Sequence, residues 1–484
     1  MALRPVSSKR DEGPPRHRRD SRNPRNPRNP RNPRNPLQQL SLLLWTLLVR
    51  FATPALLLRL WLRARREPGY GSRWWERWGW GIRGQGGGSG ALEGTDQRVW
   101  LHAVSLGETH ACVPLMQAWL EHDPSVRFLL THMTATGRAA GLEIATRAEF
   151  AGRVEQAWLP YDTPGAVRRF LRSHRPGLGV LMETEVWPNL IAQCADAGVP
   201  MALVNARLSP RSLRRAQRIR WLIEPALASL AAIVAQTPRD AERLRTLGVD
   251  GALIAGNLKF DRPVDAALSA LGRQWRAGLS DSQAQPQSGP QSGPQSGRQV
   301  ILAASTRDGE EADLLAGLHR KSLWVIVPRH PQRFDAVAEQ IQAHGFQLVR
   351  RSKDTDWAQA EVILGDSMGE MTAWYAMADV AILGGSLRPF GGQNLIEAAA
   401  VGCPVVLGPH TFNFAQAAED AVECGAALRA TTAAHALELA QSVAENPSQR
   451  KAMSLSALAW VASHRGATQR TLRALVCLLP SGPT

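Results

Sequence analysis

The sequence has few cysteines and lacks the patterns that bind a structural metal. It contains no Cys-x-x-Cys pair and no two histidines at metal-ligand spacing. The cysteines are odd in number and scattered, as Cys112, Cys194, Cys403, Cys424 and Cys477. We therefore expect no metal and no other cofactor. We interpret each cysteine as a small buried apolar residue in a protein of a reducing compartment.

An uninterrupted membrane-spanning segment is also missing. The apolar stretch at residues 40–62 is broken by Arg50, Pro54 and Arg59. The run before Arg50 is shorter than the roughly 20 residues that cross a bilayer. With further arginines up to residue 66, the pattern predicts a membrane-associated anchor helix over residues 40–66 that lies against anionic lipid. A signal peptide is the alternative, although no small-residue cleavage site follows.

Acidic residues are scarce near the amino terminus. Residues 1–66 hold 16 Lys and Arg against 3 Asp and Glu, so they carry 13 of the 15 net positive charges. The remaining residues are nearly neutral, which argues against nucleic acid as a partner. Residues 22–36 repeat Arg-Asn-Pro five times without an apolar residue. We expect residues 1–39 to form a disordered basic tail, because such a segment cannot bury enough surface to fold.

From residue 98 onward, short apolar strands alternate with helical patterns. After a first apolar run that leads into Ser105, strands are expected at residues 128–131, 179–182, 202–205, 232–235, 252–255, 300–303, 323–327, 362–364, 380–383 and 404–407. Near-continuous apolar strands separated by helices predict parallel sheets that are covered on both faces. Between the two series, residues 280–298 contain Pro-Gln-Ser-Gly three times, a flexible insertion.

The predicted fold is therefore α/β, with two Rossmann-like domains that face each other across a cleft. We expect an amino-terminal domain at residues 67–262, a linker at 263–298 and a carboxy-terminal domain at residues 299–484.

One carboxylate stands at the start of a predicted helix in the first half. Glu108 follows the apolar run that ends near His102, and in open α/β sheets ligands bind at the carboxyl ends of strands. The alternative is that Glu108 only stabilises the first helical turn, where acids are favoured by the helix dipole. His102 is more typical of a core histidine than of a base.

Other charged residues follow neighbouring strands of the same half. Glu183 and Glu185 come directly after one strand, and Arg207 and Lys259 follow two later ones. Two carboxylates beside an aromatic residue suit binding of sugar hydroxyls or stabilisation of a cationic transition state. They would equally suit capping of the next helix.

The second half carries three strand-to-helix loops of the kind that bind nucleotides. In Val327-Pro-Arg-His-Pro-Gln-Arg333, Arg329 is a guanidinium at a strand end, suited to a phosphate or a base edge. Gly365-Asp-Ser-Met-Gly-Glu370 and Gly391-Gly-Gln-Asn-Leu-Ile-Glu397 open helices with glycine, which lets an anion approach bare amides. Glu397 suits ribose hydroxyls. Helix-start loops with incidental cations remain the alternative.

Together these motifs resemble the 3-deoxy-D-manno-oct-2-ulosonic acid (Kdo) transferases of lipopolysaccharide assembly. In the first half the resemblance is carried by His-Ala-Val-Ser-Leu-Gly-Glu108, Glu183-Thr-Glu-Val-Trp-Pro-Asn189, Asn205-Ala-Arg-Leu-Ser209 and Asn257-Leu-Lys-Phe-Asp261. In the second half it is carried by Ala304-Ser-Thr-Arg-Asp-Gly-Glu-Glu311, Pro328-Arg-His-Pro331, Gly365-Asp-Ser-Met-Gly-Glu370, Asn394-Leu-Ile-Glu397 and Gly408-Pro-His-Thr-Phe-Asn-Phe414. The match runs from about Leu43 to the last helices.

The resemblance implies a metal-independent, inverting GT-B glycosyltransferase with an amino-terminal membrane anchor. Such an enzyme moves Kdo from CMP-Kdo to a lipid A precursor (lipid IVA) at the cytoplasmic face of the inner membrane. The family's general base falls on Glu108, and Glu183 and Lys259 fall on positions that stabilise the transition state. Its CMP contacts fall on Pro328, Arg329, His330, Met368, Gly369, Glu370, Asn394, Leu395, Ile396 and Glu397.

Two departures from the family pattern concern the second half. Arg307 stands where many members have His, and Gln393 and Leu395 stand where some have His and Pro. Two other functions stay open on the residues alone. One is a GT-B transferase that uses another nucleotide sugar, such as a UDP-sugar, and the other is a membrane adaptor without enzymatic activity.

Overall fold

The computed structural model describes residues 34–81, 97–281, 298–354 and 356–479. The predicted disordered tail lies outside the described residues as far as residue 33, and the Pro-Gln-Ser-Gly repeats also lie outside them. The first described helix, α1 (Pro36–Arg66), begins at Pro36, whereas the sequence predicts an anchor from residue 40. Asn35 caps this helix by accepting a hydrogen bond from the Gln38 amide.

The first lobe is built on a parallel seven-stranded sheet in the order β3-β2-β1-β4-β5-β6-β7. Its strands are β1 (Arg98–His102), β2 (Arg127–His132), β3 (Val154–Trp158), β4 (Leu178–Met182), β5 (Met201–Ala206), β6 (Ala232–Ala235) and β7 (Leu253–Ile254). Its helices are α2 (Leu106–His122), α3 (Ala135–Thr146), α4 (Pro164–His174), α5 (Pro188–Asp196), α6 (Pro210–Arg218), α7 (Arg220–Ala228) and α8 (Pro238–Arg245). Short 3-10 helices are η1 (Pro68–Tyr70), η2 (Trp74–Trp78), η3 (Ala148–Phe150) and η4 (Leu258–Asp261). The strand order reverses between β1 and β4.

The second lobe repeats this arrangement, with the parallel order β10-β11-β9-β8-β12-β13-β14. Its strands are β8 (Val300–Thr306), β9 (Leu323–Pro328), β10 (Leu348–Arg350), β11 (Val362–Leu364), β12 (Val380–Leu383), β13 (Val405–Leu407) and β14 (Ala427–Arg429). Its helices are α9 (Ala266–Asp281), α10 (Glu310–Leu315), α11 (Phe334–Ala343), α12 (Met371–Met377), α13 (Leu395–Ala400), α14 (Ala415–Glu423), α15 (Ala433–Glu445) and α16 (Pro447–His464), with the 3-10 helix η5 (Pro331–Arg333). Here the order reverses between β8 and β12.

Central strands of both sheets are apolar throughout because both faces are covered. Every residue of β4 and of β8 is buried, as expected for parallel strands between layers of helices. The predicted α/β architecture of two lobes is confirmed.

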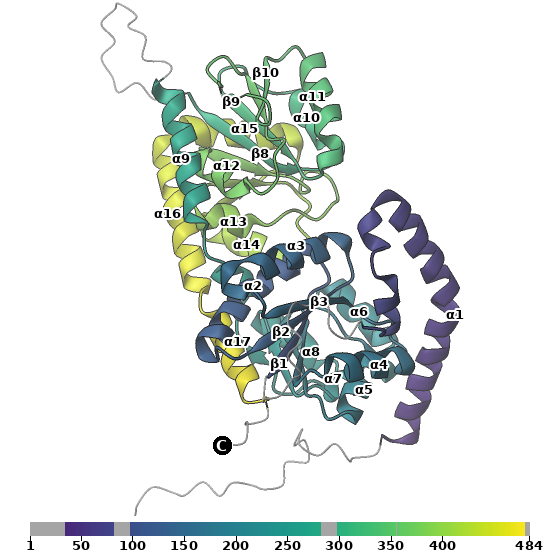
Figure 1. Ribbon diagram of the computed structural model, residues 1–484. Helices are drawn as coiled ribbons and strands as arrows, with labels where there is room; N and C mark the ends of the chain where they lie inside the picture. The colour runs from purple at the N-terminus through teal and green to yellow at the C-terminus, as the bar shows by residue number, and fades with distance from the viewer. Residues whose placement is uncertain (1–33, 82–96, 282–297, 355, 480–484) are drawn as a thin grey trace, which may run out of the picture.

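The chain crosses between the lobes twice. After α16, the last helix α17 (Ala467–Val476) returns to the first lobe and packs beside α2 (Figure 1). Leu472 and Leu475 of α17 belong to the same apolar core as β1 and α2. Asp261, at the other crossing, accepts hydrogen bonds from the amides of Gly466 and Thr468 at the start of α17. The first lobe is therefore completed by the end of the chain.

Helix α1 lies along the outside of the first lobe, where it contacts α5 and α7 (Figure 1). Ser41 and Thr46 on its inner side are buried. Large apolar residues on its other sides are exposed, among them Leu40, Leu43, Leu44, Leu47, Leu48, Phe51, Leu58, Trp61 and Leu62. By length and composition α1 is apolar enough to cross a membrane. It is thus one helix with a face docked on the protein and a face that presents leucines outward.

The cysteines are only partly as expected. Cys112, Cys194 and Cys403 are buried, whereas Cys424 and Cys477 are exposed. The expectation of five buried thiols is wrong for these two because each follows the last turn of a surface helix, α14 or α17.

Candidate active site

Glu108 lies in the first turn of α2, directly after β1. Its carboxylate accepts hydrogen bonds from the Val104 amide at 2.9 Å and from the Ser105 hydroxyl at 2.9 Å. Because β1 borders the point where strand order reverses, these bonds hold the carboxylate where α/β proteins bind ligands. They also stabilise the start of α2, so the local contacts are compatible with both functions considered from the sequence.

Glu183 follows β4, the strand beside β1. Its backbone adopts a left-handed conformation, with φ of 57°. Its carboxylate accepts a hydrogen bond from Lys259 Nζ at 2.8 Å and lies 3.9 Å from Arg207 Nη2. A non-glycine residue in this region is strained, which is common where function fixes a side chain. The structure therefore brings together Glu183 and Lys259, which are 76 positions apart in the sequence.

Asn205 holds the loop that carries Lys259. Its own φ is also positive, 51°, and its buried side-chain oxygen accepts a hydrogen bond from the Leu258 amide at 3.1 Å. The side chain of Asn257 accepts one from the Lys259 amide at 3.1 Å. Two asparagine side chains thus fix the backbone on either side of the lysine.

The pKa values of the two candidate catalytic carboxyls, Glu108 and Glu183, are shifted in opposite directions by their surroundings. Burial, followed by the negative charge of Glu183, raises the pKa of Glu108 above its ordinary value. Burial alone would also raise the pKa of Glu183, but the charges of Lys259 and Arg207 outweigh it and hold the pKa below its ordinary value. A pair of carboxyls whose pKa values move in opposite directions is typical of sites with one proton acceptor and one permanent anion.

His102 and Glu185 lie beside these groups. The His102 ring is fully buried, its Nδ1 lies 2.9 Å from the Thr131 hydroxyl, and its Nε2 lies 3.7 Å from Glu185. His102 is a core histidine, as expected. The carboxylate of Glu185 accepts a hydrogen bond from the Trp187 indole at 2.8 Å.

In the second lobe, Pro328 ends β9 and Arg329 follows it. The Arg329 amide donates to the Thr306 carbonyl at 3.0 Å, which places this loop beside the end of β8. Burial, and then the positive charge of Arg307, lowers the pKa of Arg329. Partial burial of its ring, followed by the charges of the nearby arginines, also lowers the pKa of His330. Arg307 stacks over Phe390, 4.8 Å from the ring centre.

The loop after β11 presents Met368, Gly369 and Glu370. Met368 is exposed and Gly369 has a φ of 85°, a conformation that favours glycine. Glu370 accepts hydrogen bonds from Arg351 at 2.9 Å and from the Ser367 hydroxyl. This turn therefore exposes the apolar side chain of Met368 and, at Gly369, a stretch of backbone that no side chain covers.

The third loop opens α13. The Asn394 side chain accepts a hydrogen bond from the Ile396 amide at 3.2 Å, and the side chains of Leu395 and Ile396 are buried in the core of the second lobe. These two residues can therefore reach a ligand only through their backbone. Glu397 accepts a hydrogen bond from the Thr372 hydroxyl at 3.1 Å, and its carboxylate lies 4.0 Å from the Arg262 guanidinium at the end of the first lobe.

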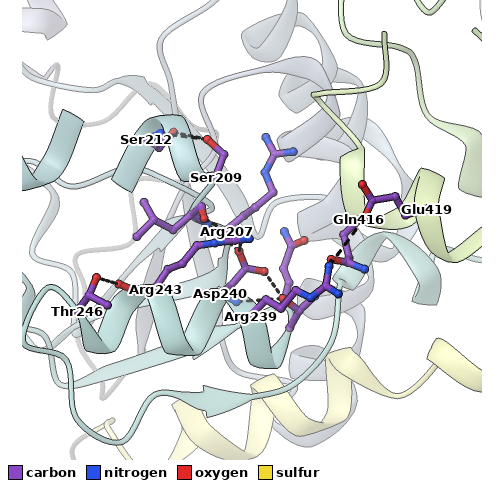
Figure 2. Close-up of polar contacts among 12 residues, drawn as sticks. Arg207, Ser209, Ser212, Arg239, Asp240, Arg243, Thr246, Gln416 and Glu419 are labelled. Carbon is purple, nitrogen blue, oxygen red and sulfur yellow. Dashed lines mark hydrogen bonds and ion pairs between the residues drawn. The ribbon is translucent and has the colours of Figure 1, made fainter. Parts of the chain in front are cut away.

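Residues 413–419 of the second lobe touch the first. Figure 2 shows Arg239 of α8 reaching Gln416 and Glu419 of α14, at 3.1 and 3.8 Å. Arg207 donates a hydrogen bond to the Asn413 carbonyl, and Lys259 Nζ lies 5.2 Å from the centre of the Phe414 ring. The lobe that carries Glu183 and Lys259 is therefore in contact with the lobe that carries the glycine loops.

No function of their own was predicted for Arg207 or Phe414, although they stand in the Asn205–Ser209 and Gly408–Phe414 motifs. The available signal was their position: each follows the end of a strand. No group of three His, Cys, Asp or Glu within the described ranges is placed to hold a metal ion.

Comparison with known proteins gives the family. Residues 72–262 match the family model of 3-deoxy-D-manno-octulosonic-acid transferases (kdotransferases). The chain is 47% identical over 442 residues to the 3-deoxy-D-manno-octulosonic acid transferase of Bordetella pertussis, which covers 89% of this chain and 98% of that one. This chain belongs to the Kdo transferase family. It is also 32% identical to the enzyme of the same name from Haemophilus influenzae, over 88% of this chain and 96% of that one.

This Kdo transferase shares its fold with solved glycosyltransferases. A glycosyltransferase from Rickettsia africae superposes with a TM-score of 0.52 at 11% identity, covering 80% of this chain and 100% of that one. The predicted GT-B class is confirmed, and the protein is a glycosyltransferase. Because the chain belongs to an enzyme family, the alternative of a membrane adaptor without enzymatic activity is no longer supported.

Proposed function

We propose that this chain transfers Kdo from CMP-Kdo to a lipid A precursor, lipid IVA, in lipopolysaccharide synthesis. The reaction would invert the anomeric centre and need no metal. The observation that carries the proposal is this arrangement in a chain of the Kdo transferase family: the carboxylate of Glu183 is paired with Lys259 Nζ at 2.8 Å, and its charge acts on the second carboxyl, that of Glu108. Glu108 and Glu183 follow β1 and β4, where the strand order of the first sheet reverses.

In the proposed reaction Glu108 is the general base. A hydroxyl oxygen of the acceptor attacks the anomeric carbon of Kdo, and its proton passes to the Glu108 carboxylate as the new bond forms. The bond from the anomeric carbon to the CMP phosphate oxygen breaks on the opposite face, so the configuration inverts. A raised pKa makes Glu108 a better proton acceptor than an ordinary carboxylate, and such catalysis typically contributes about 10²- to 10⁴-fold.

Other residues would balance the charges that develop. The sugar gains oxocarbenium character, and a nearby carboxylate stabilises this positive charge. Glu183 supplies that carboxylate. The departing CMP gains negative charge, which Arg329 and the backbone amides of the glycine loops would stabilise, with Lys259 acting from the first lobe. Pro328, His330, Met368, Gly369 and Glu370 would contact CMP, as would the segment from Asn394 to Glu397, with Leu395 and Ile396 acting through their amides.

The acceptor is a lipid, and the exposed surfaces of α1 and α6 support a membrane surface as partner. The leucines of α1 face outward. Helix α6 contains four arginines and no buried residue: Arg211, Arg214, Arg215 and Arg218. Apolar side chains beside cations are typical of helices that lie on anionic lipid. We propose that α1 lies along the cytoplasmic face of the inner membrane, because its inner side is docked on the first lobe.

The experiment that tests the function is a transfer assay with CMP-Kdo and a tetraacylated lipid A precursor, with the products sized by mass spectrometry. We expect addition of Kdo to the lipid, at a rate unchanged by EDTA. Absence of a Kdo-containing product with the purified full chain would refute the proposed donor and acceptor pair. A rate that EDTA abolishes would refute metal independence alone.

A UDP-sugar is the alternative donor. The loops around Arg329 and Met368 would read the pyrimidine edge, and cytosine and uracil differ in donors and acceptors at that edge. We expect CMP to inhibit the transfer at a concentration at least about tenfold below UMP, the ratio that one such hydrogen bond supplies. Equal inhibition by the two nucleotides would show that this pocket does not select cytosine.

A further inference from the structure

Helix α5 begins directly after the loop that carries Glu183 and Glu185, and it lacks a cap of its own. Trp187 is the amino-terminal cap residue, and it makes no side-chain hydrogen bond to the helix. Amides in the first turn of a helix have no partner within the helix and need one from elsewhere. Here the partner is Asp162, a buried residue from the segment before α4. Its carboxylate accepts the amides of Asn189 at 3.2 Å and Leu190 at 2.7 Å.

Helix α1 completes this cap from outside the sheet. The Trp45 indole donates a hydrogen bond to the Asp162 carboxylate at 2.6 Å. The Thr46 hydroxyl lies 3.2 Å from the side-chain oxygen of Asn189. At the other end of α5, Arg34 forms an ion pair with Asp196 at 2.7 Å. Helix α1 and Arg34, which directly precedes its cap, thus contact both ends of α5, the helix that follows the Glu183–Glu185 loop.

A short path joins this cap to the carboxylates. Trp187, the residue before α5, donates its indole N–H to Glu185 at 2.8 Å, and its carbonyl accepts the Ile191 amide at 2.9 Å. Movement of the first turn of α5 therefore moves Trp187, and with it the loop from Glu183 to Glu185. Because Glu183 also has a strained backbone, the loop depends on its neighbours to keep its conformation.

We propose that α1 is a positioning element of the active site, in which Trp45 holds the start of α5 through Asp162 and thereby fixes the Glu183–Glu185 loop. The inference rests on the proposed function, because it assigns the effect to transfer catalysis. It gives α1 a second purpose besides membrane attachment. Trp45 touches neither substrate and acts only through Asp162.

The charge state of Asp162 gives a signature of this contact. Burial raises the pKa of Asp162 to about 6, against the hydrogen bonds from Trp45, Leu190 and Asn189, which lower it. The buried thiol of Cys194 on α5 also faces Asp162, whose charge acts on it. Loss of the Trp45 bond removes one contribution that lowers the pKa, so Asp162 would take up a proton at a higher pH than in the wild type.

The test is Trp45→Phe in the full chain, with Trp61→Phe as the matched control. Trp61 lies on the same helix but is exposed and stacks only on Arg65 among the contacts described. For Trp45→Phe we expect kcat to fall about tenfold, the equivalent of one hydrogen bond to a charged acceptor, with the KM for CMP-Kdo unchanged. The acid side of its kcat–pH profile should move to higher pH. Trp61→Phe should keep the kcat and the kcat–pH profile of the wild type. Thr46→Val is a milder change and should lower kcat less than Trp45→Phe does.

Amide hydrogen exchange tests the link without any transfer activity. We expect Trp45→Phe to speed exchange in residues 183–191, and Trp61→Phe to leave it unchanged. Unaltered exchange, or faster exchange with wild-type kcat and pH profile, would overturn the positioning function of α1. If the wild type transfers no Kdo, the proposed function fails, whereas the exchange data still decide whether α1 fixes this loop.

Discussion

Replacing Glu108 by Gln is expected to lower kcat by about 10²- to 10⁴-fold while the affinity for CMP stays that of the wild type. The amide keeps the size of the side chain. Its oxygen can still accept the hydrogen bond from the Val104 amide, and its NH2 group can donate to the Ser105 hydroxyl, which in the wild type donates to the other carboxylate oxygen. It cannot take up the proton of the acceptor hydroxyl. CMP binding would be unaffected, because Glu108 is not among the proposed nucleotide contacts, which lie in the second lobe apart from Lys259.

The pH profile of the wild type adds a second check on Glu108. Since burial, and then the charge of Glu183, raises the pKa of Glu108, kcat should increase with pH through a value above the ordinary carboxyl range of about 4. The control is Glu121→Gln, near the other end of α2, where the side chain is exposed; it should be fully active. Near-normal turnover by Glu108→Gln would mean that the carboxylate only stabilises the start of α2.

Replacing Lys259 by Met is expected to cause the second large loss, in activity and in stability together. Glu183 would lose the partner at 2.8 Å and keep only Arg207 at 3.9 Å. Breaking a buried ion pair on one side typically costs about 3–5 kcal/mol, and we expect the lower end because Arg207 remains. Activity should fall at least about 100-fold, since a cation near the leaving group is lost.

A double variant separates the two effects. Glu183→Gln with Lys259→Met removes both charges, so it should recover most of the stability while transfer stays at least about 100-fold below the wild type. The exposed Lys321→Met is the control. If Lys259→Met were as stable as the wild type, the pair would not be the structural unit described here; if the double variant were active, neither residue would serve the transition state.

Acid should reduce the stability difference between the wild type and Lys259→Met. In the wild type, Lys259 and Arg207 outweigh burial and lower the pKa of Glu183. The pair therefore adds stability above about pH 4, and this is lost as the pH falls through the lowered pKa. Without Lys259 only Arg207 opposes burial, so the pKa of Glu183 lies higher than in the wild type and the variant loses less stability in acid. Denaturant unfolding at pH 7 and in acid measures both trends.

Much of the fold could be predicted because buried parallel strands are apolar along their whole length. β4 and β8, for example, coincide with predicted apolar runs. The strands that the sequence did not predict are β3, β10 and β14, which lie at the edges of the two sheets. An edge strand is covered less and tolerates polar residues, as in Val-Glu-Gln-Ala-Trp158 of β3, so it gives no continuous apolar signal.

The residues of the candidate site could be predicted from the sequence where they directly follow a predicted strand. Position after a strand was enough to select Glu108, Glu183 and Lys259. Contacts between distant segments left no local pattern: the bond from Trp45 to Asp162 joins residues 117 positions apart. Nor could the sequence show that Leu395 and Ile396 turn their side chains into the core. The sequence of a helix start does not tell which face of the helix the rest of the protein covers.

The return of α17 to the first lobe has a consequence for biosynthesis. Leu472 and Leu475 pack with residues of β1 and α2 that are made more than 340 positions earlier. While the ribosome is still translating the second lobe, the first lobe therefore keeps an uncovered apolar patch beside α2. A nascent chain that stalls before residue 467 would expose that patch to chaperones and proteases, however well its own sheet has formed.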